Sequence, residues 1–580
     1  MSDFLAWLSL CPVPDAVYRR WNWPGEARLG TRHRAYMPLG VYSDERSLLV
    51  MVGWNRGTRS EERPLGQALL ASRLEKEFAV MGPEALDQFL GPFAGVHIDH
   101  ATQSTTVWRD RFGRIPIQMV SLDQGWAVTT CPETAQRLAG HQPNRDHLLA
   151  FLADDRSTDD VDALAGLHRI RPAEVVRFDK HHEISGRHHW WHPAPREIDS
   201  GDADQQMTNR LQQLGAHFGQ KPHILALSAG LDSAALAAVA TSRHPGSEAI
   251  TFVDPGSPRD EGPQAQALAN HLGLRWAPFR IDRHCPLTRL DDHRFPKAWG
   301  PAGHPDMAWK LPCHRWLEMR RPNLPILYGN GADDVLWVPT YLWLRDRWRH
   351  VDLPSLFDAL PHLSAMELIR PGLGHAVDRL NLRGWRERLP SAGPPDMVWE
   401  QTSRWIDEPL PSQKPPSWPA KQRLYHLRLW RLQTWRWERA MRSLALESRL
   451  TERPIFTPFL DATFWELSLS LSPGHLVEGG RQKAILRRAV GDLLPAGCRR
   501  RPKVGGFDPV VERGLADMAS RRVYALFARP RLADQIAFEA PAFLEAYDAY
   551  RRSPGCGQAA TYRGSWAIWK TVAAELWLHQ

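Results

Sequence analysis

His223-Ile224-Leu225-Ala226-Leu227 is an apolar run that leads directly into the turn Ser228-Ala229-Gly230-Leu231-Asp232-Ser233. The apolar run predicts a buried β-strand, and the alanine-rich residues 234–240 predict a helix. A short glycine-containing turn between them aims backbone N–H groups at one point, where the helix dipole favours a phosphate. The two serines add hydroxyl donors, and Asp232 can hold magnesium on a pyrophosphate. The alternative is a helix start capped by Ser or Asp, which needs no ligand.

The same order of strand, turn and helix recurs downstream. Residues 249–253 predict a second strand, residues 261–272 a helix that ends at Gly273, and residues 325–329 a further strand. Such alternation predicts an α/β domain with a doubly wound parallel sheet. From about residue 340 to the C-terminus the pattern is mainly helical, with proline-rich breaks.

The chain of 580 residues is too long for one ordinary core, so two domains are expected. Up to about residue 195, short apolar runs alternate with turn residues, which predicts a mostly β domain with some helices. The polar stretch 196–204 is the best linker, and residues 203–219 predict a helix. We therefore expect domains at residues 1–200 and 201–580.

Two further motifs follow in the second domain. Gly329-Asn330-Gly331-Ala332-Asp333-Asp334 comes after a predicted strand and offers two carboxylates for a metal, although it can also be a plain surface turn. Because ligands bind at the carboxyl ends of parallel strands, two acidic glycine turns there favour a shared site. The basic element Arg499–Phe507 can stabilise charge on phosphates. Its alternatives are a solvated loop and a nucleic-acid patch.

Bulk composition limits the class of protein. No run of 18 apolar residues predicts a membrane span, and the N-terminus lacks the basic region of a secretion signal. Six scattered cysteines suggest neither disulfides nor zinc, so a reducing cytoplasm is expected. The net charge of +8 is compatible with nucleic acid, but an arginine-rich surface explains it without a partner. Many of the 26 tryptophans fall between Trp299 and Trp437, which indicates either core packing or a groove that grips a peptide.

Taken in order, the three motifs resemble the synthetase domain of the asparagine synthetase family, which carries S-G-G-x-D-S, G-x-G-x-D-E and R-x-K-x-G-F. Further matches extend over nearly the whole chain. They are Gly91-Pro92-Phe93-Ala94, Arg109-Asp110-Arg111-Phe112-Gly113, Pro116, Thr251-Phe252, Asp260-Glu261, Ala265, Pro458-Phe459-Leu460-Asp461, Lys483-Ala484-Ile485-Leu486-Arg487 and Leu494-Pro495. The resemblance implies an N-terminal Ntn-type glutaminase-like domain and a C-terminal ATP-pyrophosphatase domain of the adenine nucleotide α hydrolase type.

The resemblance also implies roles for individual residues, with ATP and Mg²⁺ as cofactors and an adenylate as the activated carboxylate. The residues implied to contact ATP are Leu227, Ser228, Gly230, Asp232, Ser233, Val253 and Gly329. Asp232 and Asp333 would bind magnesium. Lys503 matches the family's catalytic lysine, and Lys483 is a second catalytic candidate that would contact phosphate.

The departures from the family pattern concern the amine donor. The glutaminase needs Cys directly after Met1, but this chain has Ser2, and Val52-Gly53-Trp54 stands where the family has N-G-E. The N-terminal domain is therefore expected to be a degenerate scaffold that makes no ammonia. Asn330 replaces the Glu of asparagine synthetases or the Tyr of β-lactam synthetases, and Asn cannot act as a base. Ala229 is a mild replacement of a loop glycine, whereas Asp334 replaces the usual Glu, so the amine and its deprotonation are not expected to be handled as in either relative.

These losses resemble the lasso peptide cyclase branch of the family, whose members join an Asp or Glu side chain of a precursor peptide to its own N-terminal amine. The resemblance implies a precursor peptide, a leader peptidase and a leader-binding protein as partners, with no nucleic acid and no membrane. One alternative is an ammonia-dependent asparagine synthetase or another small-molecule amide or β-lactam-type synthetase. Another is a non-catalytic nucleic-acid-binding protein, which would bind in a salt-dependent way.

Overall fold

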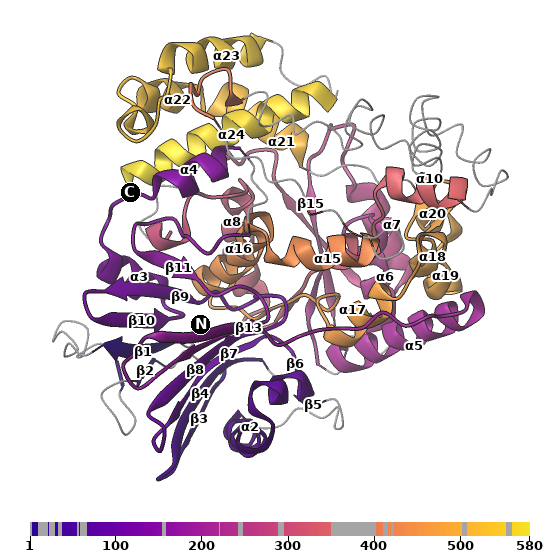
Figure 1. Ribbon diagram of the computed structural model, residues 1–580. Helices are drawn as coiled ribbons and strands as arrows, with labels where there is room; N and C mark the ends of the chain where they lie inside the picture. The colour runs from indigo at the N-terminus through magenta and orange to yellow at the C-terminus, as the bar shows by residue number, and fades with distance from the viewer. Residues whose placement is uncertain are drawn as a thin grey trace.

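The computed structural model describes residues 3–9, 21–22, 29–32, 37–54, 57–58, 67–153, 158–219, 221–241, 247–287, 295–349, 402–409, 416, 418, 423–501, 507–552 and 559–580. Figure 1 shows an antiparallel β region from the first part of the chain beside a parallel sheet that is surrounded by helices. All strands of the two large antiparallel sheets precede residue 190, and those of the parallel sheet follow residue 223.

Two antiparallel sheets form the N-terminal part. The first has the order β11-β9-β10-β1-β2, with the bounds β1 Asp3–Ser9, β2 Leu29–Arg32, β9 Gln118–Leu122, β10 Gly125–Thr129 and β11 Leu167–Arg169. The second has the order β13-β12-β8-β7-β4-β3, with the bounds β3 Leu39–Ser43, β4 Ser47–Gly53, β7 Phe93–Asp99, β8 Ser104–Arg109, β12 Glu174–Phe178 and β13 Ile184–His189. A short pair, β5 Gly57–Thr58 and β6 Phe89–Leu90, lies outside them.

The two sheets pack face to face and carry helices on their outer faces. In β4 every residue is buried, because alternate side chains enter different cores. Leu48 and Val50 join the core between the sheets, while Leu49 and Met51 face α2 (Gln67–Met81). On the other side, α3 (Pro132–Ala139) and α4 (Arg145–Leu152) cover the first sheet. The result is four layers: helix, sheet, sheet, helix.

The third sheet is parallel in every pairing and has the order β16-β15-β14-β17-β18. Its strands are β14 Ile224–Ala226, β15 Glu248–Val253, β16 Arg275–Arg280, β17 Ile326–Leu327 and β18 Ile455–Phe456. The helices α5 Ser200–Phe218, α6 Leu231–Thr241, α7 Gly262–His271 and α8 Met307–Arg320 precede or connect them. The prediction of a mixed α/β chain with a parallel sheet is confirmed. Sequence analysis missed β16, an edge strand interrupted by Pro278, and β18, which has only two residues.

The C-terminal part is mainly helical, as predicted. Its helices are α9 Ala332–Leu336, α10 Thr340–Arg349, α15 Arg423–Gln433, α16 Trp435–Thr451, α17 Ala462–Leu469, α18 Pro473–Leu476, α19 Ala484–Val490, α20 Ala496–Arg500, α21 Asp508–Arg513, α22 Ser520–Phe527, α23 Ala540–Arg552 and α24 Ala559–His579. The hairpin β19 Val477–Glu478 and β20 Arg481–Gln482 lies between α18 and α19. None of the helices in the described ranges is long and apolar enough to cross a bilayer.

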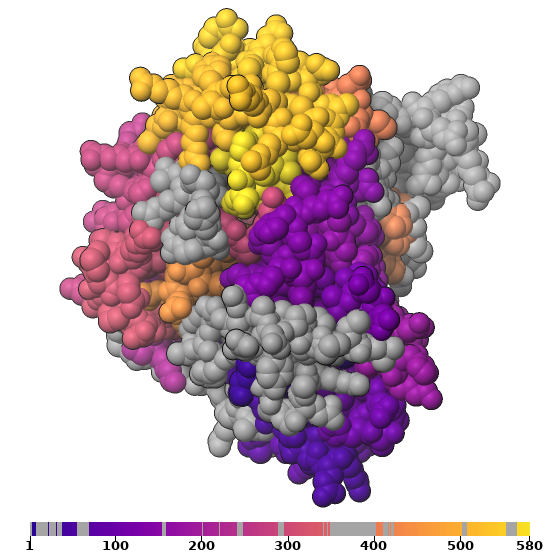
Figure 2. Space-filling view, turned by 90° about the vertical axis from the view of Figure 1, so that its left-hand side faces the viewer, coloured from indigo at the N-terminus to yellow at the C-terminus, as the bar shows by residue number. Residues whose placement is uncertain are grey.

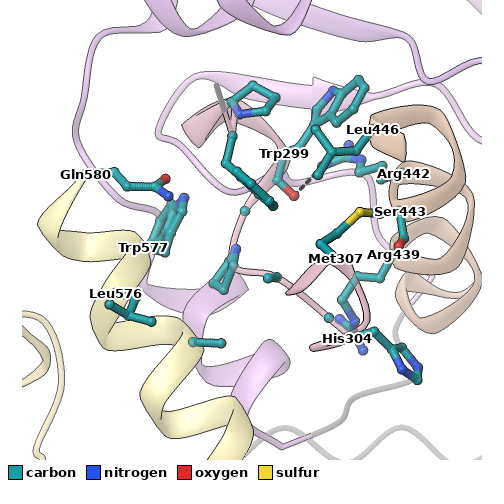
Figure 3. Close-up of a pocket in the computed structure, with 17 residues that line it drawn as sticks. Trp299, His304, Met307, Arg439, Arg442, Ser443, Leu446, Leu576, Trp577 and Gln580 are labelled. Carbon is teal, nitrogen blue, oxygen red and sulfur yellow. Dashed lines mark hydrogen bonds between the residues drawn. The ribbon is translucent and has the colours of Figure 1, made fainter. Parts of the chain in front are cut away.

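The first and last parts of the chain meet at α24. Lys570 Nζ of α24 donates to the Phe151 carbonyl of α4 at 2.9 Å. Figure 2 shows the purple N-terminal surface reaching the yellow C-terminal helices. Close to this junction, α16, α24 and residues 295–307 line a cavity that Trp299 and Trp577 border (Figure 3). The lining includes none of the residues predicted to bind ATP or magnesium.

A buried ionic network on α16 joins the two parts of the molecule. Arg442 donates to both oxygens of Asp162 at 2.8 and 2.6 Å and to Glu438 at 2.8 Å. Arg109 of β8 donates to the same Glu438 at 2.7 Å. Farther along the helix, Arg449 faces Asp3 of β1 at 3.2 Å. Helix α16 therefore links the antiparallel sheets to the part of the molecule that contains the parallel sheet.

His147 in α4 makes folding sensitive to acid. Burial lowers the pKa of its imidazole to about 4, and the nearby Asp162 only partly opposes this. Because the unfolded chain binds that proton near pH 6.5, stability is complete above pH 6.5 and falls as the pH drops towards 4. We expect a loss of up to about 3 kcal/mol over this window, measured by urea unfolding at several pH values.

The matched substitutions are His147→Gln, which should flatten the dependence between pH 6.5 and 4, and His181→Gln, whose ring is exposed. An unchanged slope in His147→Gln would show that another group controls acid unfolding.

Candidate active site

The turn of residues 228–233, which is predicted to bind phosphate and is called the phosphate turn below, lies where the strand order of the parallel sheet reverses. Strands β15 and β16 extend from β14 on one side, and β17 and β18 extend on the other. Ligands of open α/β sheets bind at such a point, outside the carboxyl ends of the strands. Leu227 leaves β14 with its N–H bonded to the Ile250 carbonyl at 2.8 Å, while its own carbonyl accepts from Thr251 Oγ1 at 2.8 Å.

The turn is closed by its own serines. Ser233 Oγ accepts from the Ser228 N–H at 3.1 Å and lies 2.9 Å from Ser228 Oγ. Ser228 Oγ in turn accepts from the Gly230 N–H at 3.1 Å. Ala229 is buried and is not among the described residues with positive φ, so alanine fits where the family has glycine. The serine hydroxyls thus hold the shape of the turn at the start of α6.

The second acidic turn, residues 329–334, packs closely against the first, residues 228–233. A Cβ on Gly329 would lie 3.0 Å from the Ser233 backbone nitrogen, which is tighter than an ordinary van der Waals contact, so glycine eases this close approach. Gly331 adopts φ +103° before α9, and a Cβ there would lie 2.5 Å from a methyl carbon of Leu460. Leu460 belongs to the Pro458–Asp461 segment after β18, so three strand ends meet here.

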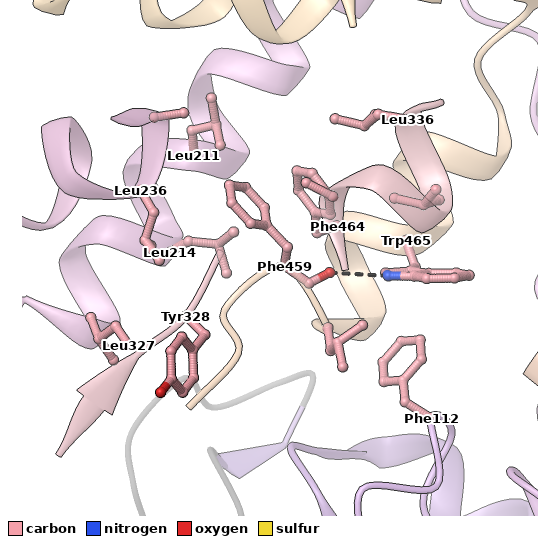
Figure 4. Close-up of a cluster of buried hydrophobic side chains, with 14 of the residues drawn as sticks. Phe112, Leu211, Leu214, Leu236, Leu327, Tyr328, Leu336, Phe459, Phe464 and Trp465 are labelled. Atoms are coloured by element: carbon pink, nitrogen blue, oxygen red, sulfur yellow. Dashed lines mark hydrogen bonds between the residues drawn. The ribbon is translucent and has the colours of Figure 1, made fainter. Parts of the chain in front are cut away.

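Apolar side chains of the core pack against the place where the ends of β14, β17 and β18 meet. Figure 4 shows Phe459 between Leu214 of α5 and Phe464 of α17. The Trp465 indole donates to the Phe459 carbonyl at 3.0 Å, and Phe112 of the N-terminal part lies 5.1 Å from the Trp465 ring. The acidic turns therefore rest on a rigid core to which both parts of the molecule contribute.

We expect Gly331→Ala to lower the free energy of unfolding by about 1–3 kcal/mol, because a side chain at positive φ is strained and the added Cβ meets Leu460. Gly201→Ala in α5 is the matched control, since a Cβ there meets nothing within 4 Å. Urea unfolding of both variants measures the difference. Equal stability of the two would contradict the predicted close approach at Gly331.

Lys483 brings the two acidic turns together. Its ammonium lies 2.6 and 2.5 Å from the two oxygens of Asp232 and 2.6 Å from Asp333 Oδ1. The lysine side chain is 9% exposed, whereas the two carboxylates are 18% and 43% exposed. Three side chains from segments that lie far apart in the sequence therefore converge at the carboxyl ends of the parallel strands.

Two residues of the basic element Arg499–Phe507, one on each side of Lys503, contact the same edge of the sheet. Lys503 lies outside the described residues. Arg501 lies 3.7 Å from Glu261, and Phe507 packs edge-on against Phe252 of β15 at 5.8 Å. Burial raises the pKa of Glu261, while Arg501 and a backbone hydrogen bond from Ala229 at the phosphate turn oppose the rise.

The remaining predicted nucleotide contact, Val253, ends β15 and is buried. Its carbonyl accepts from the Ile281 N–H at 3.0 Å, and a Cβ on Gly262 would lie 2.9 Å from its side chain. These contacts fix the end of β15 against α7 and the segment that follows β16. Val253 therefore lies one strand away from the phosphate turn.

Two residues that depart from the family pattern lie beside Asp333. Asn330 is exposed at the tip of the turn. Burial and the Asp333 carboxylate raise the pKa of Asp334 to about 6. Asn330 therefore presents a side-chain amide at the position where the resemblance would place a Glu or a Tyr.

Behind the second turn lies a buried polar cluster that sequence analysis missed. Glu447 of α16 accepts from Tyr328 Oη at 2.5 Å, from His314 Nε2 at 2.8 Å and from Lys310 Nζ at 2.8 Å. Burial alone would raise the pKa of Glu447, but Lys310 and His314 outweigh it and hold the pKa at about 2. Tyr328 immediately precedes Gly329, so the cluster anchors the turn. No local pattern marks it, because its members are 119 or more residues from Glu447.

Most of the tryptophan rings that the structure describes between Trp299 and Trp437 are buried. The buried tryptophans are Trp299, Trp309, Trp343, Trp405, Trp435 and Trp437. Trp316, Trp337 and Trp430 are half-buried. Trp348 and Trp399 lie where no side chain is described. These buried rings agree with the core-packing alternative, in which large aromatic side chains fill the interior.

The side chains at the acidic turns fit a magnesium ion that arrives with phosphates. Carboxylate oxygens are its preferred protein ligands, and magnesium is commonly held by only one or two of them together with substrate phosphates. Asp232 and Asp333 already surround one cation, the Lys483 ammonium. Among the described residues there is no group of three or more His, Cys, Asp or Glu side chains that could hold a metal alone.

Comparison with known families agrees with this geometry. A model of the asparagine synthase family matches residues 218–579, which is more than half of the sequence. The chain belongs to the asparagine synthase family. The matched region contains the phosphate turn, the second acidic turn, Lys483 and the basic element.

Two solved structures are similar in part to this asparagine synthase family member. The glutamine phosphoribosylpyrophosphate amidotransferase from B. subtilis, complexed with ADP and GMP, matches with 10% identity and a TM-score of 0.20 over 48% of this chain and 59% of that one. An allosteric regulatory enzyme of purine biosynthesis matches with 10% identity and a TM-score of 0.21 over 48% of this chain and 74% of that one. The chain thus spans less than two thirds of the first of these. No curated protein sequence matches.

Proposed function

We propose that this protein is an ATP-dependent lasso peptide cyclase. It activates an Asp or Glu side-chain carboxylate of a precursor peptide as the adenylate, and the peptide's N-terminal amine then forms an isopeptide macrolactam. The observation that carries the ATP chemistry is the convergence of Asp232, Asp333 and Lys483 at the reversal point of the parallel sheet. The choice of a peptide amine rests on the departures at Ser2 and Asn330.

In the first step, a carboxylate oxygen attacks the α-phosphorus of ATP, and the bond to the β-phosphate oxygen breaks to release pyrophosphate. The N–H groups and helix dipole at the start of α6 bind the leaving phosphates. Asp232 and Asp333 would hold the magnesium ion, which would supply positive charge to neutralise the phosphates. Lys503 is the proposed contact to the reacting phosphate, and Lys483 the second. The other proposed nucleotide contacts are Leu227, Ser228, Gly230, Ser233, Val253 and Gly329.

In the second step, the amine nitrogen attacks the activated carbonyl carbon, AMP leaves, and the amine loses a proton. Asn330 cannot take this proton. Holding the two ends of one peptide together lowers the entropic part of the barrier, which is a general advantage of intramolecular attack. The proposed partners are therefore the precursor peptide, a leader peptidase and a leader-binding protein, all in the cytoplasm, without nucleic acid or membrane.

The N-terminal domain, residues 1–200, is proposed to be a degenerate Ntn-type glutaminase that serves as a scaffold for the synthetase domain, residues 201–580. The buried contacts of α16 support this role, since Arg109 and Asp162 pair with helix residues at full burial. Ser2 lies outside the described residues.

The test uses synthetic peptides that have a free N-terminal amine and an Asp or Glu at successive positions. Mass spectrometry should show an ATP-dependent loss of one water and resistance of the N-terminus to amine labelling. Lys503→Ala should abolish both cyclisation and ATP–pyrophosphate exchange while the protein stays folded. Full activity of this variant would overturn the mechanism.

A small-molecule amide synthetase is the second candidate, favoured by the family match. Incubation with ATP, aspartate and ammonium separates the two. Asparagine formed at a useful rate, without cyclisation of any peptide, would replace the lasso proposal. Magnesium-independent, salt-sensitive RNA or DNA binding without pyrophosphate release would instead favour the non-catalytic alternative.

A further inference from the structure

Lys483 occupies the position between the two carboxylates that are proposed to bind magnesium. Its ammonium is within 2.6 Å of oxygens from both Asp232 and Asp333. The lysine side chain is 9% exposed, so it is a built component of the site and not a surface charge that happens to be near. The Lys483 ammonium is thus an internal cation that pairs with both carboxylates.

The backbone fixes this lysine in place. Lys483 has φ 59° and ψ 38°, a left-handed conformation that residues with a side chain rarely adopt. Hydrogen bonds before and after Lys483 hold the backbone in this conformation. The Gln482 side chain exchanges two hydrogen bonds with the Val338 backbone at 2.8 and 3.0 Å, and the Arg487 N–H donates to the Lys483 carbonyl at 3.1 Å. Strain of this kind is kept at functional sites when the surroundings determine it.

We propose that Lys483 is an internal counter-ion that excludes divalent metal from Asp232 and Asp333 until ATP arrives. The proposal rests on the proposed ATP site. The ammonium and a magnesium ion cannot both bind the same carboxylate oxygens, because magnesium ligands lie at about 2.1 Å and the two cations repel. Metal alone must therefore displace Lys483 from its ion pairs without providing a new anion for it.

ATP changes this balance because its phosphates supply the missing negative charge. With nucleotide bound beside the turn of residues 228–233, the displaced ammonium can pair with phosphate oxygens while the metal takes the carboxylates. Metal and nucleotide then bind with positive coupling, and the metal site is occupied only when there is a substrate to activate. The same lysine thereby serves the empty site as a counter-ion and the loaded site as a phosphate contact.

The test measures Mn²⁺ binding to the nucleotide-free protein by electron paramagnetic resonance of the free ion. Lys483→Met removes the charge and keeps the apolar stem, so it should bind one Mn²⁺ at least about tenfold more tightly than the natural protein. Lys483→Arg retains the charge and should bind as weakly as the natural protein. Lys221→Met is the matched control, because Lys221 is exposed and precedes β14 at the opposite end of the strand.

A second measurement locates the bound ion and checks the fold. Mn²⁺ should raise the melting temperature of Lys483→Met, and the additional Asp333→Asn substitution should remove both this rise and the tight binding. Equal Mn²⁺ affinity in Lys483→Met and the natural protein, with both folded by circular dichroism, would overturn the proposal. So would tight Mn²⁺ binding by the nucleotide-free natural protein. No peptide or turnover is involved, so failure of the cyclase proposal would leave this result unaffected.

Discussion

Asp232→Asn is expected to slow ATP–pyrophosphate exchange by about 10³-fold, which is the range seen when one preorganised electrostatic contact to a transition state is removed. The substitution keeps the size of the side chain at the start of α6 but removes its charge. Asp232 is the carboxylate to which Lys483 makes two close contacts, at 2.6 and 2.5 Å, so both the proposed metal and the lysine lose a partner. Exchange of labelled pyrophosphate into ATP in the presence of the peptide measures the effect.

Asp204→Asn is the matched control for this charge change. Asp204 lies on α5, where it pairs with Arg488 at 2.7 Å on the surface. This variant should retain the exchange rate of the natural protein, because an exposed pair contributes little. An Asp232→Asn protein that exchanged pyrophosphate at an undiminished rate would show that Asp232 has no part in nucleotide activation.

Arg442→Met should cause the largest loss of stability, about 3–5 kcal/mol of the free energy of unfolding. The arginine lies within α16 and neutralises two fully buried carboxylates, Asp162 and Glu438. Methionine fills much of the space but leaves Asp162 without its guanidinium partner. Burial would then raise the pKa of Asp162, which the arginine holds at about 2 against that burial. Urea unfolding near neutral pH measures the loss.

Arg280→Met is the comparison, since Arg280 pairs with Asp282 at 2.8 Å on an exposed edge strand. Its unfolding midpoint should stay that of the natural protein. If Arg442→Met unfolded at the natural midpoint as well, the α16 network would not be the link that holds the antiparallel sheets to the synthetase region.

Local patterns predicted much of the parallel sheet. The run before Ser228 and the alanines after it correspond to β14 and α6, and the predicted helix over 203–219 corresponds to α5, Ser200–Phe218. These predictions succeed because burial, propensity and glycine turns act over a few neighbouring residues. Strand β16 was not predicted because its residues are largely exposed and include a proline. Strand β18 was not predicted because two residues are too few to show a hydrophobic periodicity.

The buried network of α16 could not be predicted in the same way. Glu438, Arg442 and Glu447 look like the charged face of a solvated helix, since Arg and Glu are usually exposed. Their burial is possible only because Arg109, Asp162 and Lys310 arrive from distant segments with opposite charge. For the same reason the sequence left both core packing and a binding groove open for the tryptophan-rich segment, and its described rings are mostly buried in the core.

By itself, the sequence determined the phosphate turn after His223–Leu227, the second acidic turn and the family to which they belong, because each motif is short and its chemistry is local. Only the tertiary structure decided that Lys483 stands between Asp232 and Asp333. That contact joins turns more than 100 residues apart, and it depends on the strand order that reverses beside β14 and on a left-handed backbone at Lys483. Charge pairing over such separations follows from the fold and leaves no periodic signal in the chain.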